Sequence, residues 1–333
     1  MESPILDRRV VLQLMGDWGY ANLHRACGWL GSQVVVRSAA GSRAGVWNGD
    51  GWLVNVHAVA DRTVDAALVT PASLAKLAID GRGPFAGRPL PALRALGLLP
   101  QFDRLVFAVR RDVGVSSFSE LRARRPSIRI SIPDTANGDL VGYAARLLLE
   151  ASGAGEAEAE SWGGRYVTFR GLPIWAREHT SPHAYLERVK RGEADAVIFE
   201  AMMLDLWQEL AIDPGLNFLP VEEAALARIE AQTGWPRAEV PAGYYPGQVE
   251  AFETLDFAHF LLICREDMPE DLAHVIAYCM GETRMILERQ YHHLKPERSP
   301  LTYPLDPVQM GRAPIALHPG AQRYYESLEV EGG

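Results

Sequence analysis

The sequence predicts an α/β protein of two lobes that close like a clamshell, each lobe built on a mixed sheet flanked by helices. Short apolar runs that end in small polar residues alternate with helical patterns, and 333 residues exceed what one core usually supports. Apolar stretches near residues 106–112 and 256–264 each lead into a charged turn and a helix, as two crossings between lobes would. We therefore expect lobe I to comprise residues 1–110 and 258–333, and lobe II residues 111–257.

The first lobe opens with three units of strand and polar loop. Residues 10–15 form an apolar run that Gly16 ends, and residues 20–30 carry apolar side chains at helical spacing. Residues 33–37 and 65–69 are β-branched runs that close on small polar residues. Because open α/β sheets bind ligands at the carboxyl ends of their strands, we expect the three loops to converge on one edge.

The second lobe repeats this pattern. Strands are expected at residues 105–109, 128–132 and 194–199, and the middle one leads into a polar loop at 133–138 and then an amphipathic helix. The Gly/Ala/Glu-rich stretch at 153–164 is expected to be an exposed loop.

Composition excludes several classes of function. A hydrophobic content of 48% is typical of a globular protein, and a net charge of −9 argues against a nucleic-acid binder. No apolar run approaches the ~20 residues of a membrane helix. The three cysteines have no metal-ligand spacing, so we expect buried free thiols in a reducing compartment, with no metal and no cofactor. These are Cys27, Cys264 and Cys279.

Three segments rich in proline, glycine and aromatic residues stand far apart in the chain. They are the first segment (83–91), the middle segment (240–248) and the tail segment (317–325). Their order and spacing resemble those of the TAXI family of solute-binding proteins, the receptor subunits of one class of tripartite ATP-independent periplasmic (TRAP) transporters. The resemblance covers nearly the whole chain. It implies a type 2 periplasmic-binding-protein fold that closes on a small polar organic ligand, carboxylate- or amino-acid-like, and TRAP permease subunits as partners of an exported chain.

The resemblance and the loop positions together give a set of candidate ligand-binding residues at strand ends and in the middle segment. They are Asp17, Trp18, Tyr20, Ser38, Ser42, Arg43, Thr70, Ser73, Asp134, Thr135, Asn137, Glu200, Tyr244 and Tyr245. Backbone N–H groups at helix starts in such loops suit carboxylates.

Several of these residues have a structural alternative. Asp17 and Asp134 either face a cleft or cap the helices that follow them. Glu200 is the stronger candidate, because it follows a fully apolar strand that could raise its pKa. Arg43 either holds a carboxylate or lies on the surface, and the tyrosine pair of the middle segment either walls the ligand or packs between the lobes.

Departures from the family pattern favour a rival function. Asp17 would repel an anion and Trp18 would fill the space that glycine leaves open in the family. The rival is a cytoplasmic decarboxylase, lyase or isomerase on the same fold, with Glu200, Asp17 and Asp134 as acid/base residues; a ligand sensor is a third alternative. No signal peptide is visible, so we expect a soluble cytoplasmic protein, or a periplasmic one if a leader was removed.

A metal site is the weakest of the alternatives. His179 and His183 are four residues apart, but Pro182 lies between them and looks like a helix start, which would leave His179 outside that helix. We therefore predict no metal ligands.

Overall fold

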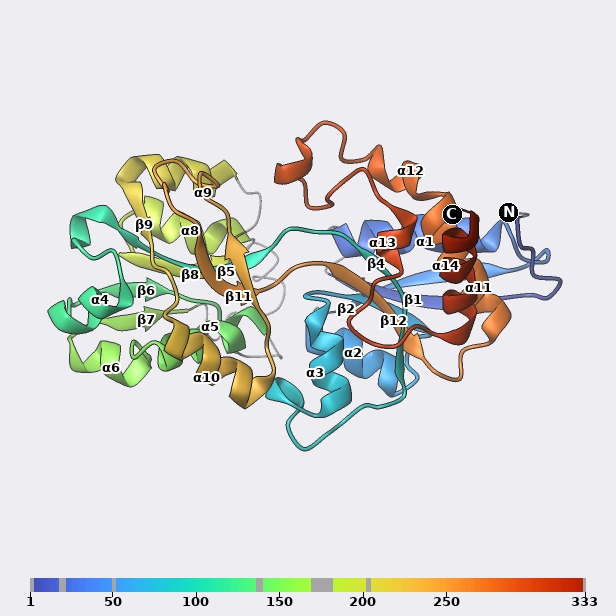
Figure 1. Cartoon of the computed structure of the whole chain (residues 1–333), viewed down its shortest axis with the longest axis horizontal. Coiled ribbons are helices and arrows are strands. Elements are labelled where there is room, and N and C mark those ends of the chain that lie inside the picture. Colours follow the sequence, from blue (N-terminus) through green and yellow to red (C-terminus); the bar gives the residue numbers. More distant parts are fainter. Residues whose placement is uncertain are drawn as a thin grey trace. The chain divides into compact units, whose positions relative to one another are not determined.

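The chain forms two compact units. Unit 1 comprises Met1–Phe102 and Ala258–Gly333, and unit 2 comprises Asp103–Phe257. In Figure 1 unit 1 runs from blue to teal and from orange to red, and unit 2 from green through yellow to golden orange. The predicted α/β class, with two mixed sheets and flanking helices, is confirmed. No helix among the described residues is both long and apolar enough to span a bilayer. The computed structural model describes residues 3–17, 22–49, 52–135, 140–168, 182–201 and 205–331.

The sheet of unit 1 has the strand order β2-β1-β3-β12-β4. β1 is parallel to β2 and β3, whereas β12 is antiparallel to β3 and β4, so β1, β2 and β3 end at one edge. The strands are β1 (Val11–Asp17), β2 (Arg43–Gly49), β3 (Ala66–Val69), β4 (Leu93–Leu99) and β12 (Phe260–Arg265). The helices are α1 (Asn22–Val35), α2 (Trp52–Ala60), α3 (Ser73–Asp80), α11 (Glu270–Glu282), α12 (Arg284–Glu288), α13 (Pro307–Met310) and α14 (Pro319–Glu331), with short 3-10 turns at Gly83–Phe85 and Pro296–Arg298.

Helix α1 covers one face of β1 and β2. Leu23, Cys27, Leu30 and Val34 recur at helical spacing, and each is at most 2% exposed. Gly31 brings the helix close to the sheet, because a Cβ at this position would lie 2.9 Å from a side-chain carbon of β2.

The prediction of a strand at residues 33–37 is wrong. Residues 33–35 end α1, and the second strand of the unit is β2 instead. The β-branched run was ambiguous because Val34 also continues the apolar stripe of α1. Residues 38–42 therefore form the loop that enters β2, not a loop that leaves a strand.

The carboxyl-terminal tail closes over α11 and β4. The Tyr324 hydroxyl donates to Glu282 Oε1 at 2.8 Å, and the Tyr325 hydroxyl donates to the Leu96 carbonyl at 3.1 Å. Gly281 leaves room for this arrangement, since a Cβ there would lie 1.8 Å from Tyr324 Oη. The tail segment thus packs within unit 1.

The sheet of unit 2 has the order β10-β11-β5-β8-β6-β7, and β9 pairs with β5 outside this path. β6 is parallel to β7 and β8, whereas β5 is antiparallel to β8 and β11. The strands are β5 (Arg104–Arg110), β6 (Arg129–Ser131), β7 (Arg165–Val167), β8 (Ala196–Glu200), β9 (Leu216–Phe218), β10 (Arg237–Val240) and β11 (Phe252–Asp256). The helices are α4 (Phe118–Arg124), α5 (Leu140–Ala151), α6 (Glu156–Ser161), α8 (Pro182–Lys190), α9 (Asp205–Leu210) and α10 (Glu223–Thr233), with a 3-10 turn at Arg111–Val113 and a π turn at Ala211–Gly215. The loop expected at 153–164 contains α6.

The boundary between the units lies before Asp103, whereas the sequence placed it after residue 110. β5 belongs to unit 2 because its backbone pairs with β8, β9 and β11. The two connecting segments bond to each other within each unit. In unit 2 the Phe257 N–H donates to the Asp103 carbonyl, and in unit 1 the His259 N–H donates to the Gln101 carbonyl, each at 3.2 Å.

The three cysteines are buried and free, as expected. Burial raises the pKa of the Cys279 thiol to about 12, so this side chain stays protonated and behaves as a small apolar group.

We predict that Gly281→Ala destabilises the protein by about 1–3 kcal/mol, because the added methyl group displaces the Tyr324 ring and breaks its bond to Glu282. Gly28→Ala is the matched control: this glycine is also helical, and a Cβ there has no neighbour within 4 Å. The control is expected to gain about 0.5–1 kcal/mol. Urea unfolding followed by circular dichroism measures both, and equal stability of the two variants would contradict the packing.

Candidate functional site

The carboxyl ends of β1, β2 and β3 form a polar edge in unit 1. β1 and β2 end in register at Asp17 and Gly49. β3 ends at Val69 and leads through Thr70 to the first residue of α3, Ser73. Asp17 lies at this edge as predicted, and the predicted Trp18 and Tyr20 lie outside the described residues.

Asn55 of α2 holds this edge together. Its side chain is fully buried, and its Nδ2 donates to the Gly16 carbonyl of β1 at 3.3 Å and to the Leu68 carbonyl of β3 at 2.9 Å. Gly49 of β2 lies directly against it, because a Cβ there would be 2.1 Å from Asn55 Oδ1. One amide therefore touches the ends of three strands.

Thr70 and Ser73 supply the unused polar groups of this edge. Their hydroxyl oxygens are buried and have no hydrogen-bond partner within the described part of the chain. A buried hydroxyl without a partner costs free energy, so these two hydroxyls are candidates for bonding to a ligand. The start of an eight-residue helix, α3, lies at the same place and favours negative charge.

Ser38, Ser42 and Arg43 do not belong to this edge, which corrects the prediction. Arg43 pairs with Val11, so all three lie where β2 begins, at the opposite edge of the sheet. Ser38 Oγ donates to the Val34 carbonyl at 2.8 Å, and Ser42 Oγ accepts from the Val10 N–H at 3.0 Å. The two serines serve the turn between α1 and β2.

A second polar group of residues lies at the carboxyl end of β8 in unit 2. Glu200 ends this strand and is 7% exposed. Asp134 lies on the same edge, because β6 and β8 are parallel and both residues follow the paired Ser131 and Val197 by three positions.

The Asp134 carboxylate bonds to the backbone next to it. Asp134 Oδ1 accepts from the Thr135 N–H at 2.7 Å, and Thr135 is exposed. The predicted Asn137, and His179 of the metal alternative, lie outside the described residues.

The tyrosine pair of the middle segment meets this strand end. The hydroxyls of Tyr244 and Tyr245 donate to the Ala201 carbonyl at 3.4 and 3.3 Å. Tyr245 is 1% exposed and stacks on Phe218 with ring centroids 4.1 Å apart, which places it in the core of unit 2 instead of on a ligand surface. The Tyr244 ring is perpendicular to the Tyr245 ring, and the two ring centroids are 4.9 Å apart.

Sequence reasoning missed Asp103 and Arg104, which complete an acidic edge with Glu200 and Asp256. Burial, and next the charge of Glu200, hold the pKa of Asp103 well above its usual range. Arg104 Nη1 donates to Asp256 Oδ1 at 3.0 Å, and burial lowers the pKa of this guanidinium although both aspartates oppose the shift. The available signal was a pair of charged residues directly before an apolar strand.

The first segment has a structural place. Phe85 is 2% exposed and meets the His57 ring edge-on at a centroid distance of 5.5 Å. The Leu90 N–H donates to the Ala78 carbonyl at 2.8 Å, so the segment folds back on α3 before β4 begins. Of the three segments, only the middle one reaches a polar strand end.

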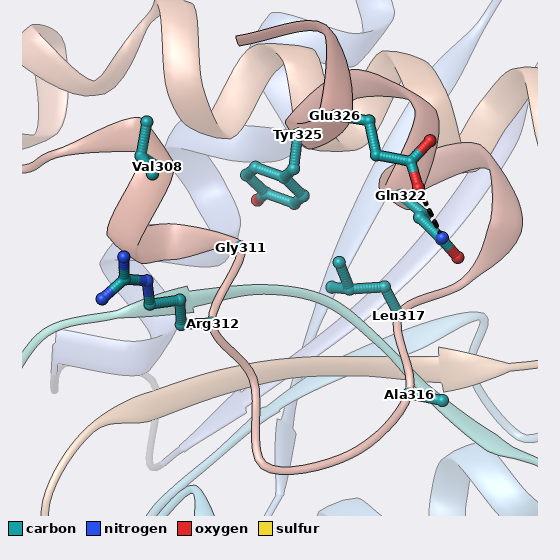
Figure 2. A pocket seen from close by; sticks show the side chains of 8 residues that line it. All are labelled: Val308, Gly311, Arg312, Ala316, Leu317, Gln322, Tyr325 and Glu326. Atoms are coloured by element: carbon teal, nitrogen blue, oxygen red, sulfur yellow. Dashed lines mark hydrogen bonds between the residues drawn. The ribbon is translucent and has the colours of Figure 1, made fainter. Parts of the chain in front are cut away.

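An open depression of about 330 Å³ lies on unit 1, between α13 and α14 (Figure 2). Its polar side chains include Gln322 and Glu326, which bond to each other at 2.6 Å, and Tyr325, which donates to β4. It shares no residue with the polar edge. The lining residues are Val308, Gly311, Arg312, Ala316, Leu317, Gln322, Tyr325 and Glu326.

Solved structures of similar arrangement cover nearly the whole chain. A Xanthomonas citri protein solved with ATP is 14% identical, with a TM-score of 0.49 over 95% of this chain and 98% of that one. A TctC solute-binding protein from Polaromonas, solved without ligand, is 13% identical, with a TM-score of 0.46 over 97% and 98%. An R. palustris protein solved with adipate is 14% identical, with a TM-score of 0.45 over 97% and 95%. At these values no conclusion about this chain's ligand follows.

The family is shown by the sequence itself. The pattern of the NMT1-like family matches residues 32–328, which include most of both units. The chain therefore belongs to the NMT1-like family.

Proposed function

We propose that the chain is a solute-binding protein of the TAXI kind, whose lobes close on a small polar organic ligand that is carboxylate- or amino-acid-like. The observation that carries the proposal is the pair of buried hydroxyls of Thr70 and Ser73, which have no partner in the described part of the chain. They lie at the strand edge where open α/β sheets bind ligands, beside the start of α3.

The two hydroxyls and the start of α3 suit a negatively charged group, whereas Asp17 at the end of β1 does not. Each hydroxyl can donate one hydrogen bond, and the first turn of α3 adds the positive end of its dipole. The backbone around these groups is held in place by Asn55, so little entropy is lost when a ligand arrives. A carboxylate is the simplest group that accepts from both hydroxyls at once.

The proposal also includes TRAP permease subunits as partners. The middle segment, which contributed to the TAXI resemblance, contacts the end of β8 in unit 2. An exported chain of this kind would deliver its ligand to TRAP permease subunits in the periplasm. Lobe closure then requires that the ligand bind the closed form better than the open one.

A second candidate function is supported by the acidic edge of unit 2. Asp103 is 1% exposed and lies close enough to Glu200 for the charge of one to raise the pKa of the other. A carboxyl group with a raised pKa beside a second carboxyl group can act as an acid. An enzyme such as a decarboxylase, lyase or isomerase would use Glu200 and Asp103 as such a pair.

We predict that Thr70→Val and Ser73→Ala each weaken ligand binding about tenfold or more, because each removes one hydrogen bond to a charged group. Native mass spectrometry of freshly purified protein identifies the co-purified molecule, and calorimetry with that molecule and a panel of dicarboxylates and amino acids measures affinity. Ser152→Ala is the control, since its hydroxyl is also buried without a described partner but lies after α5 in unit 2. Unchanged affinity in both edge variants would remove the polar edge from the site.

Glu200→Gln separates the two functions. In a binding protein it changes affinity at most, and the co-purified molecule is recovered unaltered from both proteins. In an enzyme the wild type yields a mixture related as substrate and product, and the variant loses the turnover because the amide cannot carry a proton. Glu250→Gln, an exposed carboxylate of the same unit, serves as the control. Nuclear magnetic resonance of the incubated ligand reports which outcome holds.

We also predict a pH-dependent effect of Asp103→Asn on stability. Because burial and Glu200 raise the pKa of Asp103, the native state binds its proton more tightly than the unfolded chain does. Stability contributed by the protonated group is present at acidic pH and is lost as pH rises through the raised pKa. The variant should therefore gain stability relative to wild type between pH 5 and pH 8, measured by urea unfolding. An equal difference at both pH values would mean that Asp103 titrates normally.

A further inference from the structure

Strand β2 leaves an open edge on the sheet of unit 1. It is the outermost strand on its side, and no described strand pairs with its outer side. The other edge of the sheet is covered by the chain's own tail: the Ala95 N–H of β4 donates to the Ala316 carbonyl at 2.9 Å, and the His318 N–H donates to the Ala95 carbonyl at 2.8 Å. Natural sheets usually protect an edge in this way, or with lysine, proline or a bulge.

The sequence of β2 carries little such protection. Its seven residues, Arg43–Gly49, contain one charged side chain, at the first position, and no proline. The Arg43 N–H donates to the Val10 carbonyl next to β1, so the peptide groups of alternate residues Gly45 and Trp47 face inward as well. The N–H and C=O groups of Ala44 and Val46 therefore face outward, ready to pair.

One face of this edge also exposes two large apolar side chains. Trp47 is 55% exposed and Val11, on the neighbouring strand, is 50% exposed. The Trp47 indole is held in place because its Nε1 donates to Gln13 Oε1 at 2.5 Å. Gly45 makes room for that amide, since a Cβ there would lie 2.7 Å from Gln13 Oε1. The ring is a prepared contact surface, not a mobile side chain.

We propose that β2 pairs antiparallel with β2 of a second copy, forming a two-fold dimer with one continuous sheet. In the register centred on Gly45, the two glycines face each other, and the outward groups of Ala44 meet those of Val46 from the other copy. Arg43 and Trp47 lie on one face of the strand, so each guanidinium lies across from the other copy's indole.

The side chains of β2 favour pairing with β2 of a second copy over pairing with a strand of different sequence. Opposed Arg and Trp side chains attract through the ring's negative face, and the two-fold axis makes the contact twice. Arg43 has no ion-pair partner among the described residues that would compete for it. The strand is thus complementary to itself, both in its backbone groups and in its side chains.

A charge-swap series tests the dimer. Sedimentation equilibrium from about 1 to about 100 µM should show a reversible dimer of the wild type. Trp47→Arg should weaken it about a hundredfold, since two attractive contacts become two repulsions. Arg43→Glu combined with Trp47→Arg should restore it, because each carboxylate then lies across from a guanidinium. Val249→Arg, an exposed apolar site in unit 2, should leave the dimer unchanged.

Three outcomes would overturn the proposal. They are a wild type that stays monomeric over the whole range, a Trp47→Arg variant that still dimerises, and a double variant that stays monomeric while its urea unfolding matches that of the wild type. Circular dichroism of each variant shows that a lost dimer is not a lost fold.

Discussion

The Asn55 side chain is the interaction on which the polar edge of unit 1 depends. Its amide donates to the ends of β1 and β3 and lies against Gly49 of β2, so three parallel strands end at one level. Replacing this side chain would remove two hydrogen bonds, each of which contributes about 0.5–1.5 kcal/mol. Because α2 carries Asn55, the contact also ties this helix to the strand ends, and Thr70 and Ser73 follow directly after β3.

The two units offer different chemistry at corresponding strand ends. Unit 1 has neutral hydroxyls beside a helix start, which suit an anion, and also the acidic residue Asp17 at the end of β1. Unit 2 has the carboxyl groups of Asp103, Glu200 and Asp256 with a single guanidinium, Arg104, paired to one of them. Burial and the charge of Glu200 raise the pKa of Asp103, so this carboxyl group keeps its proton to a higher pH than an exposed aspartate does.

Much of the fold could be predicted from local pattern. The strands at 65–69, 105–109 and 194–199 are apolar runs too short for helices and bounded by polar residues, and the structure has strands at these places. Residues 33–37 could not be predicted, because Val34 fits both a strand and the stripe of α1, and only packing against Cys27 and Leu30 decides between them. The same error assigned Ser38, Ser42 and Arg43 to the polar edge, whereas they lie at the opposite edge of the sheet.

The sequence by itself determined the α/β class, the presence of two units and the polar character of the strand ends at Asp17, Thr70 and Glu200. These follow from periodicity and composition, which are local properties of the chain. Tertiary structure alone decided that Tyr245 is a core residue stacked on Phe218, that Asp103 is buried next to Glu200, and that the first and tail segments pack within unit 1. The physical reason is that burial and neighbouring charge depend on residues far apart in the chain, which only the pairing of strands brings together.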